Sequence, residues 1–402
     1  MRETTVAVVT ALSPSATTLA EYGLHFLRAL GRRRGIRVIA LVEDLDLDYP
    51  DIDGVEIVRC WRFDSPATPV RILRAARHRR ADVVLINAHF TSFGSSKVAA
   101  ALGLCSPALL RAAGIPVVTL LHNLVDTVDL GAAGFGGSPL RERLLRAAGR
   151  LVTRIVLRST LVTTTMPGYV DILRQRYGAR NVAWTPHGTF DAPMPPCASP
   201  TVPVVLAFGK FGTYKRVEGL IAAVRSLGRP DVTVVVAGTD SPNATGYLAD
   251  VERRMGGSDV EFTGYVAEDD VERLFRGARL TVFPYEATTG SSGVLHQAAG
   301  FGCAPVVPRV GDLERLVADE GLTGVFFEPG DVDDMARAIT RLLDDESERA
   351  RIVQHNYDAA VGLTMDMVMD LFLVHLAEAA TGDPRALLSS VVEWQPTAVL
   401  WP

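Results

Sequence analysis

Cysteine is scarce in this chain, and the usual signals of export and membrane insertion are missing. The chain has four cysteines without any Cys-x-x-Cys spacing: Cys60, Cys105, Cys197 and Cys303. This pattern argues against a zinc site or a disulfide framework and fits a reducing compartment. No apolar run is long enough to span a bilayer, and the first residues enter a strand pattern without the apolar segment of a signal peptide. We therefore expect a cytoplasmic location.

Neither sign of charge dominates the composition. Lysine and arginine together number 41, aspartate and glutamate 46, and the formal net charge is -5. This balance gives no reason to expect a nucleic acid as a partner. With 48% hydrophobic and 22% charged residues, the chain has the composition of a folded protein. Its 402 residues exceed one ordinary core, so we expect two domains, and the richness in alanine and arginine hints at a bacterial genome.

The first half alternates short β-branched runs with amphipathic segments. The runs predict strands over 6–10, 38–42, 55–58, 83–86, 117–121, 161–165 and 182–184. Segments with apolar residues on one helical face predict helices over 19–32, 70–79, 98–113 and 141–158. Continuous apolar strands between helices indicate a parallel sheet that is covered on both faces.

A proline-rich stretch over 191–203 then interrupts the pattern, and the second half repeats it. Strands are expected over 204–208, 232–237, 260–263, 279–283, 304–307 and 324–327. Helices are expected over 216–227, 246–255, 268–276, 293–301, 311–319, 332–344 and 352–380. The prediction is an α/β protein of two Rossmann-like, doubly wound domains with a cleft between them. We place the first domain at 1–195, a linker at 196–203, the second domain at 204–375, and a tail at 376–402 that packs back on the first domain.

Two features of the second half suit an anionic ligand. Strand 204–208 runs into Gly209 and Lys210, and Lys215 follows before the next helix, although the whole chain has only three lysines. About seventy residues later, a glycine- and serine-rich loop over 290–293 opens another helix. Lysines supply point charge, and the backbone N–H groups at a helix N-terminus favour anions. Together they predict a site for a diphosphate.

These features belong to a series of motifs that resembles the retaining glycosyltransferases of the GT-B type, in particular family 4. The resemblance covers most of the chain and is strongest over 182–345. In chain order the motifs are the hinge-like Thr185-Pro186-His187-Gly188, Gly209-Lys210 through Lys215, Phe262-Thr263-Gly264-Tyr265-Val266, Phe283-Pro284-Tyr285, and Gly302-Cys303-Ala304-Pro305-Val306-Val307. The second motif resembles the family's "G-R-x-x-x-x-K", with Lys210 in place of the arginine, and the last its "G-x-P-V-V" with one extra residue.

The resemblance implies transfer of a sugar from a nucleotide-sugar donor to an acceptor hydroxyl, with retention of configuration and without a metal or other cofactor. Lys210 and Lys215 would stabilise the departing diphosphate. The donor would be bound mainly by the second domain, at Gly209, Gly264, Tyr265, Val266, Thr289, Gly290, Ser291, Ser292, Gly293, Val294 and Gln297.

The sequence departs from the family at its paired glutamates. Counting back from Gly302 places Gln297 at the second glutamate, whose role is to hold the donor ribose, and Thr289 at the first. Glu286 lies three residues before Thr289. Either Glu286 contacts the sugar through a longer loop or Thr289 replaces the glutamate. The departure alternatively marks an unusual sugar or lost activity.

The first domain offers candidates on the acceptor side. His122 resembles the family's "T-x-H-D/N" element near the reacting centre, where a histidine can bond the sugar and stabilise charge. His89 follows the preceding strand in the same way, and the remaining candidates are Ser15, Thr17, Asn123 and His187. The acidic string over 44–48 is best interpreted as a solvated loop, so no metal is predicted.

Two alternatives stay open at this point. The chain could be a non-catalytic glycosyltransferase-like binding protein, or another GT-B enzyme such as a nucleotide-sugar epimerase or a phosphorylase. The basic helix with Arg141, Arg143, Arg146, Arg150 and Arg154 is either a solvated face or a weak peripheral contact to anionic lipid or an acidic acceptor.

Overall fold

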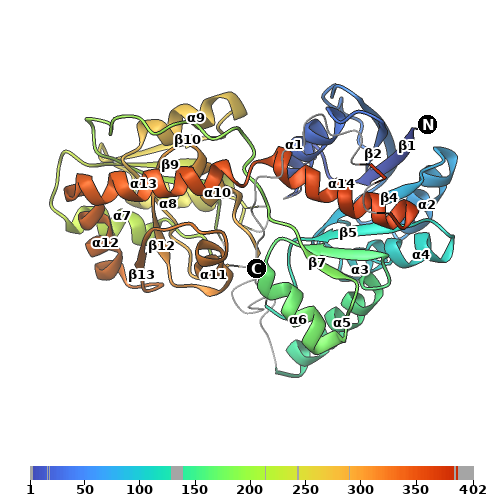
Figure 1. Cartoon of the computed structure of the whole chain (residues 1–402). Coiled ribbons are helices and arrows are strands. Elements are labelled where there is room, and N and C mark those ends of the chain that lie inside the picture. The colour runs from blue at the N-terminus through green and yellow to red at the C-terminus, as the bar shows by residue number, and fades with distance from the viewer. Residues whose placement is uncertain are drawn as a thin grey trace. The chain divides into compact units, whose positions relative to one another are not determined.

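The protein folds into two compact units, each built around its own sheet (Figure 1). The computed structural model describes residues 3–15, 17, 19–127, 139–212, 214–241, 244–288, 290–383 and 386–387. Unit 1 comprises Met1–Val125, Ala148–Thr185 and Met365–Pro402, and unit 2 comprises Asp126–Ala147 and Pro186–Thr364. The predicted α/β fold of two doubly wound units is confirmed.

Unit 1 has a seven-stranded parallel sheet in the order β3-β2-β1-β4-β5-β6-β7. The strands are β1 (Thr4–Val9), β2 (Ile36–Glu43), β3 (Val55–Trp61), β4 (Val83–Ala88), β5 (Val117–Leu121), β6 (Leu161–Thr164) and β7 (Val182–Trp184). The residues of β4 and β5 are buried throughout. Burial on both faces explains why these strands are continuous apolar runs rather than alternating ones.

The helices of unit 1 correct one prediction. They are α1 (Ala20–Gly31), α2 (Thr68–His78), α3 (Lys97–Gly103), α4 (Ser106–Ala112), α5 (Pro139–Val156) and α6 (Pro167–Tyr177). The first half of α5, up to Ala147, is grouped with unit 2. The single helix predicted over 98–113 is wrong, because α3 and α4 are separate. Pro107 lies in the first turn of α4, where its missing N–H costs nothing, whereas inside a continuous helix it would break a hydrogen bond.

The last helix, α14 (Met365–Thr381), belongs to unit 1 although it follows unit 2 in the sequence. Phe372 meets Phe26 of α1 edge-on with ring centroids 5.1 Å apart, and Arg33 pairs with Asp370 at 3.1 Å. The sequence predicts helical structure over 352–380. In the structure this segment holds two helices, since α13 (Glu346–Val361) ends before Gly362 and α14 starts at Met365. The predicted tail beyond residue 387 lies outside the described residues.

Unit 2 has a six-stranded parallel sheet in the order β10-β9-β8-β11-β12-β13. The strands are β8 (Val204–Phe211), β9 (Thr233–Asp240), β10 (Val260–Gly264), β11 (Leu280–Val282), β12 (Ala304–Pro308) and β13 (Val325–Phe327). The helices besides α13 are α7 (Glu218–Ser226), α8 (Tyr247–Met255), α9 (Glu268–Gly277), α10 (Gly293–Gly300), α11 (Gly311–Asp319) and α12 (Val332–Asp344).

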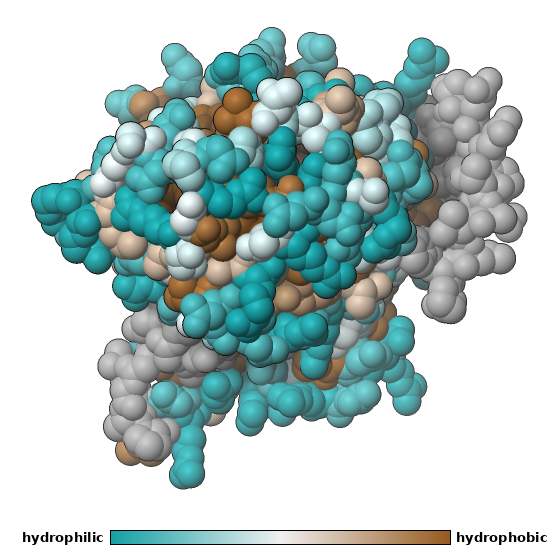
Figure 2. Space-filling model, turned by 90° about the vertical axis from the view of Figure 1, so that its left-hand side faces the viewer, coloured by the Kyte–Doolittle hydropathy of each residue, from teal (hydrophilic) through white to brown (hydrophobic). Residues whose placement is uncertain are grey.

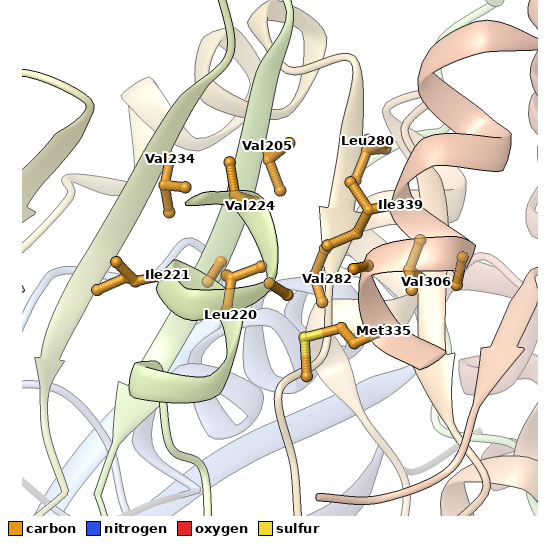
Figure 3. Close-up of a cluster of buried hydrophobic side chains, with 14 of the residues drawn as sticks. Val205, Leu220, Ile221, Val224, Val234, Leu280, Val282, Val306, Met335 and Ile339 are labelled. Atoms are coloured by element: carbon orange, nitrogen blue, oxygen red, sulfur yellow. The ribbon is translucent and has the colours of Figure 1, made fainter. Parts of the chain in front are cut away.

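Two apolar clusters cover the two faces of this sheet. On one face, Leu220 of α7 and Ile339 of α12 pack with Val205 and Val306 of the strands (Figure 3). On the other face, Phe275 of α9 and Ala298 of α10 pack with Leu206 and Val235. Each fully buried aliphatic side chain contributes about 1.5–3 kcal/mol of transfer free energy, so the sheet and its helices form one stable body.

The division between the units precedes the predicted linker. It falls between Thr185 and Pro186, because the proline-rich stretch packs along unit 2. The Met194 N–H donates to the carbonyl of Gly300 at 2.8 Å, and Arg276 donates to the carbonyl of Pro195 at 3.3 Å. The chain returns to unit 1 at Met365, ahead of the predicted limit at 375.

Candidate functional site

The topology of unit 2 brings two loops together. The central strand β8 has β9 on one side and β11 on the other, so the order of the strands reverses between β8 and β11. Ligands of open α/β sheets bind at such a switch point, beyond the carboxyl ends of the strands. The two loops that leave this point carry Lys215 and the glycine-rich segment before α10. The two motifs expected to hold a diphosphate therefore leave neighbouring strands at one edge of the sheet.

Backbone hydrogen bonds tie these two loops to each other. The Arg216 N–H donates to the carbonyl of Pro284 at 3.0 Å, and the Glu286 N–H donates to that of Tyr214 at 2.8 Å. Lys215 closes its own turn by donating from its N–H to Gly212 at 2.9 Å. Buried backbone groups that satisfy each other in this way hold the loops in a single arrangement.

The ammonium of Lys215 lies over an aromatic ring. Its Nζ is 4.5 Å from the centroid of the Tyr285 ring, and Tyr285 itself is buried. Burial lowers the pKa of the Lys215 ammonium, and Tyr214 opposes this shift. The ring face offsets part of the lost hydration. Lys210 is a half-buried residue of β8 opposite Thr239, since the strand runs three residues further than the predicted 204–208.

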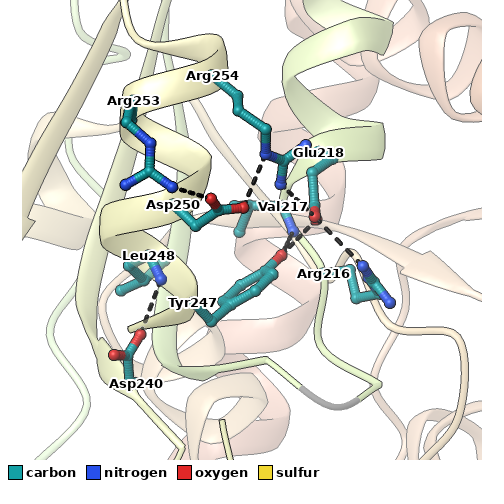
Figure 4. Close-up of polar contacts among 9 residues, drawn as sticks. All are labelled: Arg216, Val217, Glu218, Asp240, Tyr247, Leu248, Asp250, Arg253 and Arg254. Atoms are coloured by element: carbon teal, nitrogen blue, oxygen red, sulfur yellow. Dashed lines mark hydrogen bonds and ion pairs between the residues drawn. The ribbon is translucent and has the colours of Figure 1, made fainter. Parts of the chain in front are cut away.

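A polar network fixes the start of α7, next to Lys215 (Figure 4). The Tyr247 hydroxyl accepts from the Val217 N–H at 2.8 Å and donates to the carboxylate of Glu218. Arg216 and Arg254 donate to the same carboxylate at 3.4 and 3.3 Å. Burial works against the charge, but these bonds hold the pKa of Glu218 below its usual range. No sequence pattern indicates this network, because Tyr247 and Arg254 come from α8, about thirty residues further along the chain.

An acidic side chain of α11 holds the glycine-rich loop through a hydrogen bond. Gly290, at φ +75°, donates its N–H to the buried carboxylate of Asp312 at 2.9 Å. Ser292 caps α10 by accepting from the Leu295 N–H at 3.3 Å. The hydroxyl of Ser291 is buried without a hydrogen-bond partner in the described part of the chain. A capped helix start with a buried, unsatisfied hydroxyl beside it suits an anion.

The remaining donor candidates come from β8, from the end of β10 and from α10. A Cβ on Gly209 would lie 3.5 Å from a methyl of Val294, and one on Gly238 would lie 1.8 Å from the Gly209 carbonyl oxygen, so glycine is required where β8 meets β9. Val266 and Val294 pack against the same apolar cluster. Gly264, which ends β10, and Tyr265, 76% exposed, lie at the surface, and Gln297 is half-buried in α10.

The structure leaves both candidates for the first glutamate open. Glu286 is exposed and faces a pocket of about 410 Å³ whose lining includes Arg216, Arg254, Tyr285 and Phe327. Thr289 lies outside the described residues. The position of Glu286 beside two arginines is compatible with a polar ligand in this pocket.

Three further side chains, those of His296, Glu320 and His187, lie close to the start of α10. Only His187 was a candidate from the sequence. His296 of α10 forms an ion pair with Glu320 at 2.6 Å, and both are fully buried. The other ring nitrogen of His296 lies 2.7 Å from the Ser292 carbonyl. His187 stacks on His296 with ring centroids 4.9 Å apart. His187 was predicted on the acceptor side of the first domain, but the structure groups it with unit 2, next to the donor helix.

Unit 1 has a switch point of its own, between β1 and β4. His122 follows β5 and places its Nε2 2.7 Å from Asn87 Oδ1, while the amide of Asn87 donates to Thr10 Oγ1 at 3.0 Å. The Asn87 oxygen must accept here, so Nε2 carries the proton. Burial and the neighbouring His89 lower the pKa of His122 to about 3. The ring is therefore neutral, and it can act as a hydrogen-bonding group but not as a cation.

The other acceptor-side candidates differ in their hydrogen-bond partners. His89 accepts at Nδ1 from the Thr91 N–H at 3.0 Å, burial lowers its pKa to about 4, and its Nε2 is buried without a partner among the described residues. Asn123 Oδ1 accepts from the Phe90 N–H at 3.2 Å. Ser15 donates to Glu43 at 3.0 Å and accepts from the Thr17 N–H at 3.4 Å. Of these side chains, His89 offers the clearest unused donor.

Comparison with known proteins agrees with this arrangement. Residues 202–345 match the family described as glycosyl transferases group 1. The sulfoquinovosyl transferase SQD2 of Arabidopsis thaliana is 30% identical over 152 residues, which is 37% of this chain and 28% of the relative. The D-inositol 3-phosphate glycosyltransferase of Stackebrandtia nassauensis is 27% identical over 281 residues, 64% of this chain and 61% of the relative. The chain thus spans less than two thirds of the length of these relatives.

Solved structures resemble the whole chain. Sucrose-phosphate synthase from Thermosynechococcus elongatus has a TM-score of 0.71 at 18% identity, over 92% of this chain and 98% of the other. The Anabaena protein Alr3699/HepE, in complex with UDP-glucose, has a TM-score of 0.67 at 16% identity, over 93% and 99%. These similarities show the fold, which is that of the GT-B glycosyltransferases. Within it, unit 2 carries a domain of the group 1 glycosyltransferase family, as the motifs predicted. Among the described helices, none is both long and apolar enough to cross a membrane.

Proposed function

We propose that the protein transfers a sugar from a nucleoside-diphosphate sugar to an acceptor hydroxyl, with retention of configuration and without a metal. The observation that carries the proposal is the switch point of unit 2, where the Lys215 loop and the capped start of α10 leave adjacent strands. The match of residues 202–345 to a glycosyltransferase family supports the same assignment.

In this proposal, unit 2 binds the donor. Lys215 and Lys210 supply positive charge to the departing diphosphate, and the N–H groups at the start of α10 add directed hydrogen bonds. These groups provide the charge stabilisation that a divalent metal supplies in other transferases, which is why we propose a metal-independent reaction. The complexes of Alr3699/HepE with UDP and UDP-glucose make UDP the first nucleotide to test.

Unit 1 would bind the acceptor, with His89 and His122 at the ends of neighbouring strands. A ring whose pKa is about 3 is a poor proton acceptor at neutral pH, so His122 is unsuited to deprotonate the acceptor hydroxyl. We therefore propose that an oxygen of the leaving phosphate takes this proton as the new bond forms on the same face of the sugar. In unit 1, His122 would bind the sugar through a hydrogen bond. In unit 2, Glu286 is the candidate for a sugar contact.

A cytoplasmic location remains part of the proposal. All four cysteines are free, which fits a reducing compartment.

One observation favours a competing function. Gln297 stands where the family has the second glutamate of its pair, which suits a binding protein that keeps the fold without catalysis.

The test is incubation of the purified protein, in the presence of a chelator, with UDP-, GDP-, ADP- and dTDP-sugars and a panel of hydroxyl acceptors. We expect release of nucleoside diphosphate that depends on one donor, and proton NMR of the product should show the donor's anomeric configuration. Donor binding without release would favour the binding protein, and an inverted product would contradict retention.

A further inference from the structure

Helix α5 (Pro139–Val156) presents a stripe of leucines to solvent. The exposed fractions are 67% for Leu140, 63% for Leu144 and 59% for Leu151. Since 3.6 residues make a turn, positions four and eleven residues apart lie on one face of a helix. Exposed large apolar side chains in register on one face are a sign of an interaction surface, unlike single ones.

These leucines are not on the buried face of α5. Thr153 and Val156 are buried, and they lie on the opposite side of the helix. A Cβ on Gly149, one turn before Thr153, would lie only 2.4 Å from a methyl of Val125, so the helix backbone is in close contact there. The helix therefore has one apolar side that is covered and a second that is not.

Arginines flank the exposed stripe. Arg143, Arg150 and Arg154 are exposed on its one flank, and Arg154 also lies over the ring of Tyr177 of α6, 5.7 Å from the centroid. The helix carries five arginines against one glutamate, in a chain whose net charge is -5. Positive charge is thus concentrated around the leucines. The face of the molecule in Figure 2 differs from the leucine stripe, because it is mainly hydrophilic and its hydrophobic side chains form small separate patches.

We propose that this face of α5, formed by Leu140, Leu144, Leu151, Arg143, Arg150 and Arg154, binds the surface of an anionic lipid bilayer. The leucines enter the boundary between head groups and acyl chains, and the guanidinium groups pair with lipid phosphates. This binding goes beyond the transfer reaction and does not depend on it. If both hold, the acceptor is met at a membrane surface.

A lipid surface fits this face better than a second copy of the chain. In a two-fold dimer the same patch meets itself, so a second copy would cover the leucines but would bring no opposite charge to the arginine flank. An interface without complementary charge fits this face less well than one that supplies it. An anionic bilayer carries charge opposite to that of the arginine flank.

Co-sedimentation with vesicles tests the proposal. The full chain is mixed with vesicles of phosphatidylcholine alone, and of phosphatidylcholine with phosphatidylglycerol. We expect binding to the anionic vesicles only, reduced by salt. Leu144→Ser with Leu151→Ser, and separately Arg143→Gln with Arg150→Gln, should each lower the partition coefficient by about tenfold or more.

Matched variants separate this surface from general effects. Leu47→Ser removes a leucine that is 54% exposed elsewhere in unit 1, and Arg273→Gln removes an exposed arginine of α9. Both should bind vesicles like the wild type. Circular dichroism checks that the α5 variants keep their helix, and UDP binding, which is assigned to the Lys215 loop and the start of α10, should be unchanged in them.

Three results would overturn the proposal. The wild type could fail to bind anionic vesicles, or it could bind them with no loss in the α5 variants. It could also form a dimer in solution that the leucine substitutions dissociate, which would assign the face to a second copy. A wild-type protein that binds vesicles but does not bind any nucleotide-sugar donor would instead count against the proposed transfer alone.

Discussion

At the scale of single residues, the position of Lys215 is a compromise between stability and function. Burial lowers the pKa of its ammonium, so the folded protein holds this charge at a cost that the ring of Tyr285 offsets only in part. A diphosphate would reverse the balance, because it supplies the missing counter-charge. Under the proposed function, Lys215 therefore serves a ligand rather than the fold.

Lys215→Met tests this interpretation directly. Removing the partly desolvated charge should raise the melting temperature of the free protein, while sugar transfer falls roughly a hundredfold or more. Calorimetry and a nucleoside-diphosphate release assay measure the two effects. A variant that loses stability, or one that keeps its turnover, would contradict the role assigned to Lys215.

His296 gives a second prediction at this scale. Burial disfavours the charged ring, but Glu320 and the Ser292 carbonyl outweigh it and raise the pKa of His296 above its usual value. A raised pKa in the folded state stabilises the protein fully below the unfolded value of about 6.5 and loses this contribution as pH rises through the folded pKa. The melting temperature of the wild type should fall more steeply above neutral pH than that of His296→Gln. Parallel curves for the two proteins would refute the charged pair.

At the scale of elements, the donor loops owe their shape to neighbouring helices. The start of α7 depends on Tyr247 of α8, and the glycine-rich loop depends on Asp312 of α11. These partners are separated by tens of residues in the chain, and no periodicity announces them. The sequence predicted the strand that ends before each loop and the helix that begins after it, but not the side chains that hold the loop between them.

Tyr247→Phe should therefore weaken donor binding more than it weakens the fold. It removes the hydroxyl that bonds Val217 and Glu218, which costs about 1 kcal/mol of stability per lost bond. We expect the KM for the donor to rise several-fold. Tyr49→Phe is the control, because it loses one hydroxyl bond to a backbone carbonyl in unit 1. Equal KM values for the two variants would show that the network does not position the loop.

At the scale of the whole molecule, the sequence predicted the alternation of strands and helices well, and the order of the motifs predicted the family of unit 2. It did not predict the order of the strands within each sheet, because hydrophobic periodicity contains no information on pairing. The same limit applies to His296 and Glu320, whose ion pair joins α10 to the residue that follows α11. A return to the first domain was expected only for residues 376–402, and the earlier start of α14 at Met365 depends on contacts such as that between Phe26 and Phe372.

The strand order also explains why several candidate residues lie close to one another. In each sheet the reversal lies beside the first strand of the unit, at β1 and at β8. His89 follows β4, and the glycine-rich loop follows β11, so in each unit some of the candidates leave the strand next to its reversal. Local patterns that are weak singly become specific once the topology brings them to one edge.

Calorimetric titration of UDP into the protein measures whether the Lys215 loop and the start of α10 bind a diphosphate. The wild type should bind UDP, Lys215→Ala should bind it at least tenfold more weakly, and Lys97→Ala, which removes the one lysine outside this site, should bind it like the wild type. Equal affinity of Lys215→Ala and wild type for UDP would contradict diphosphate binding at this site.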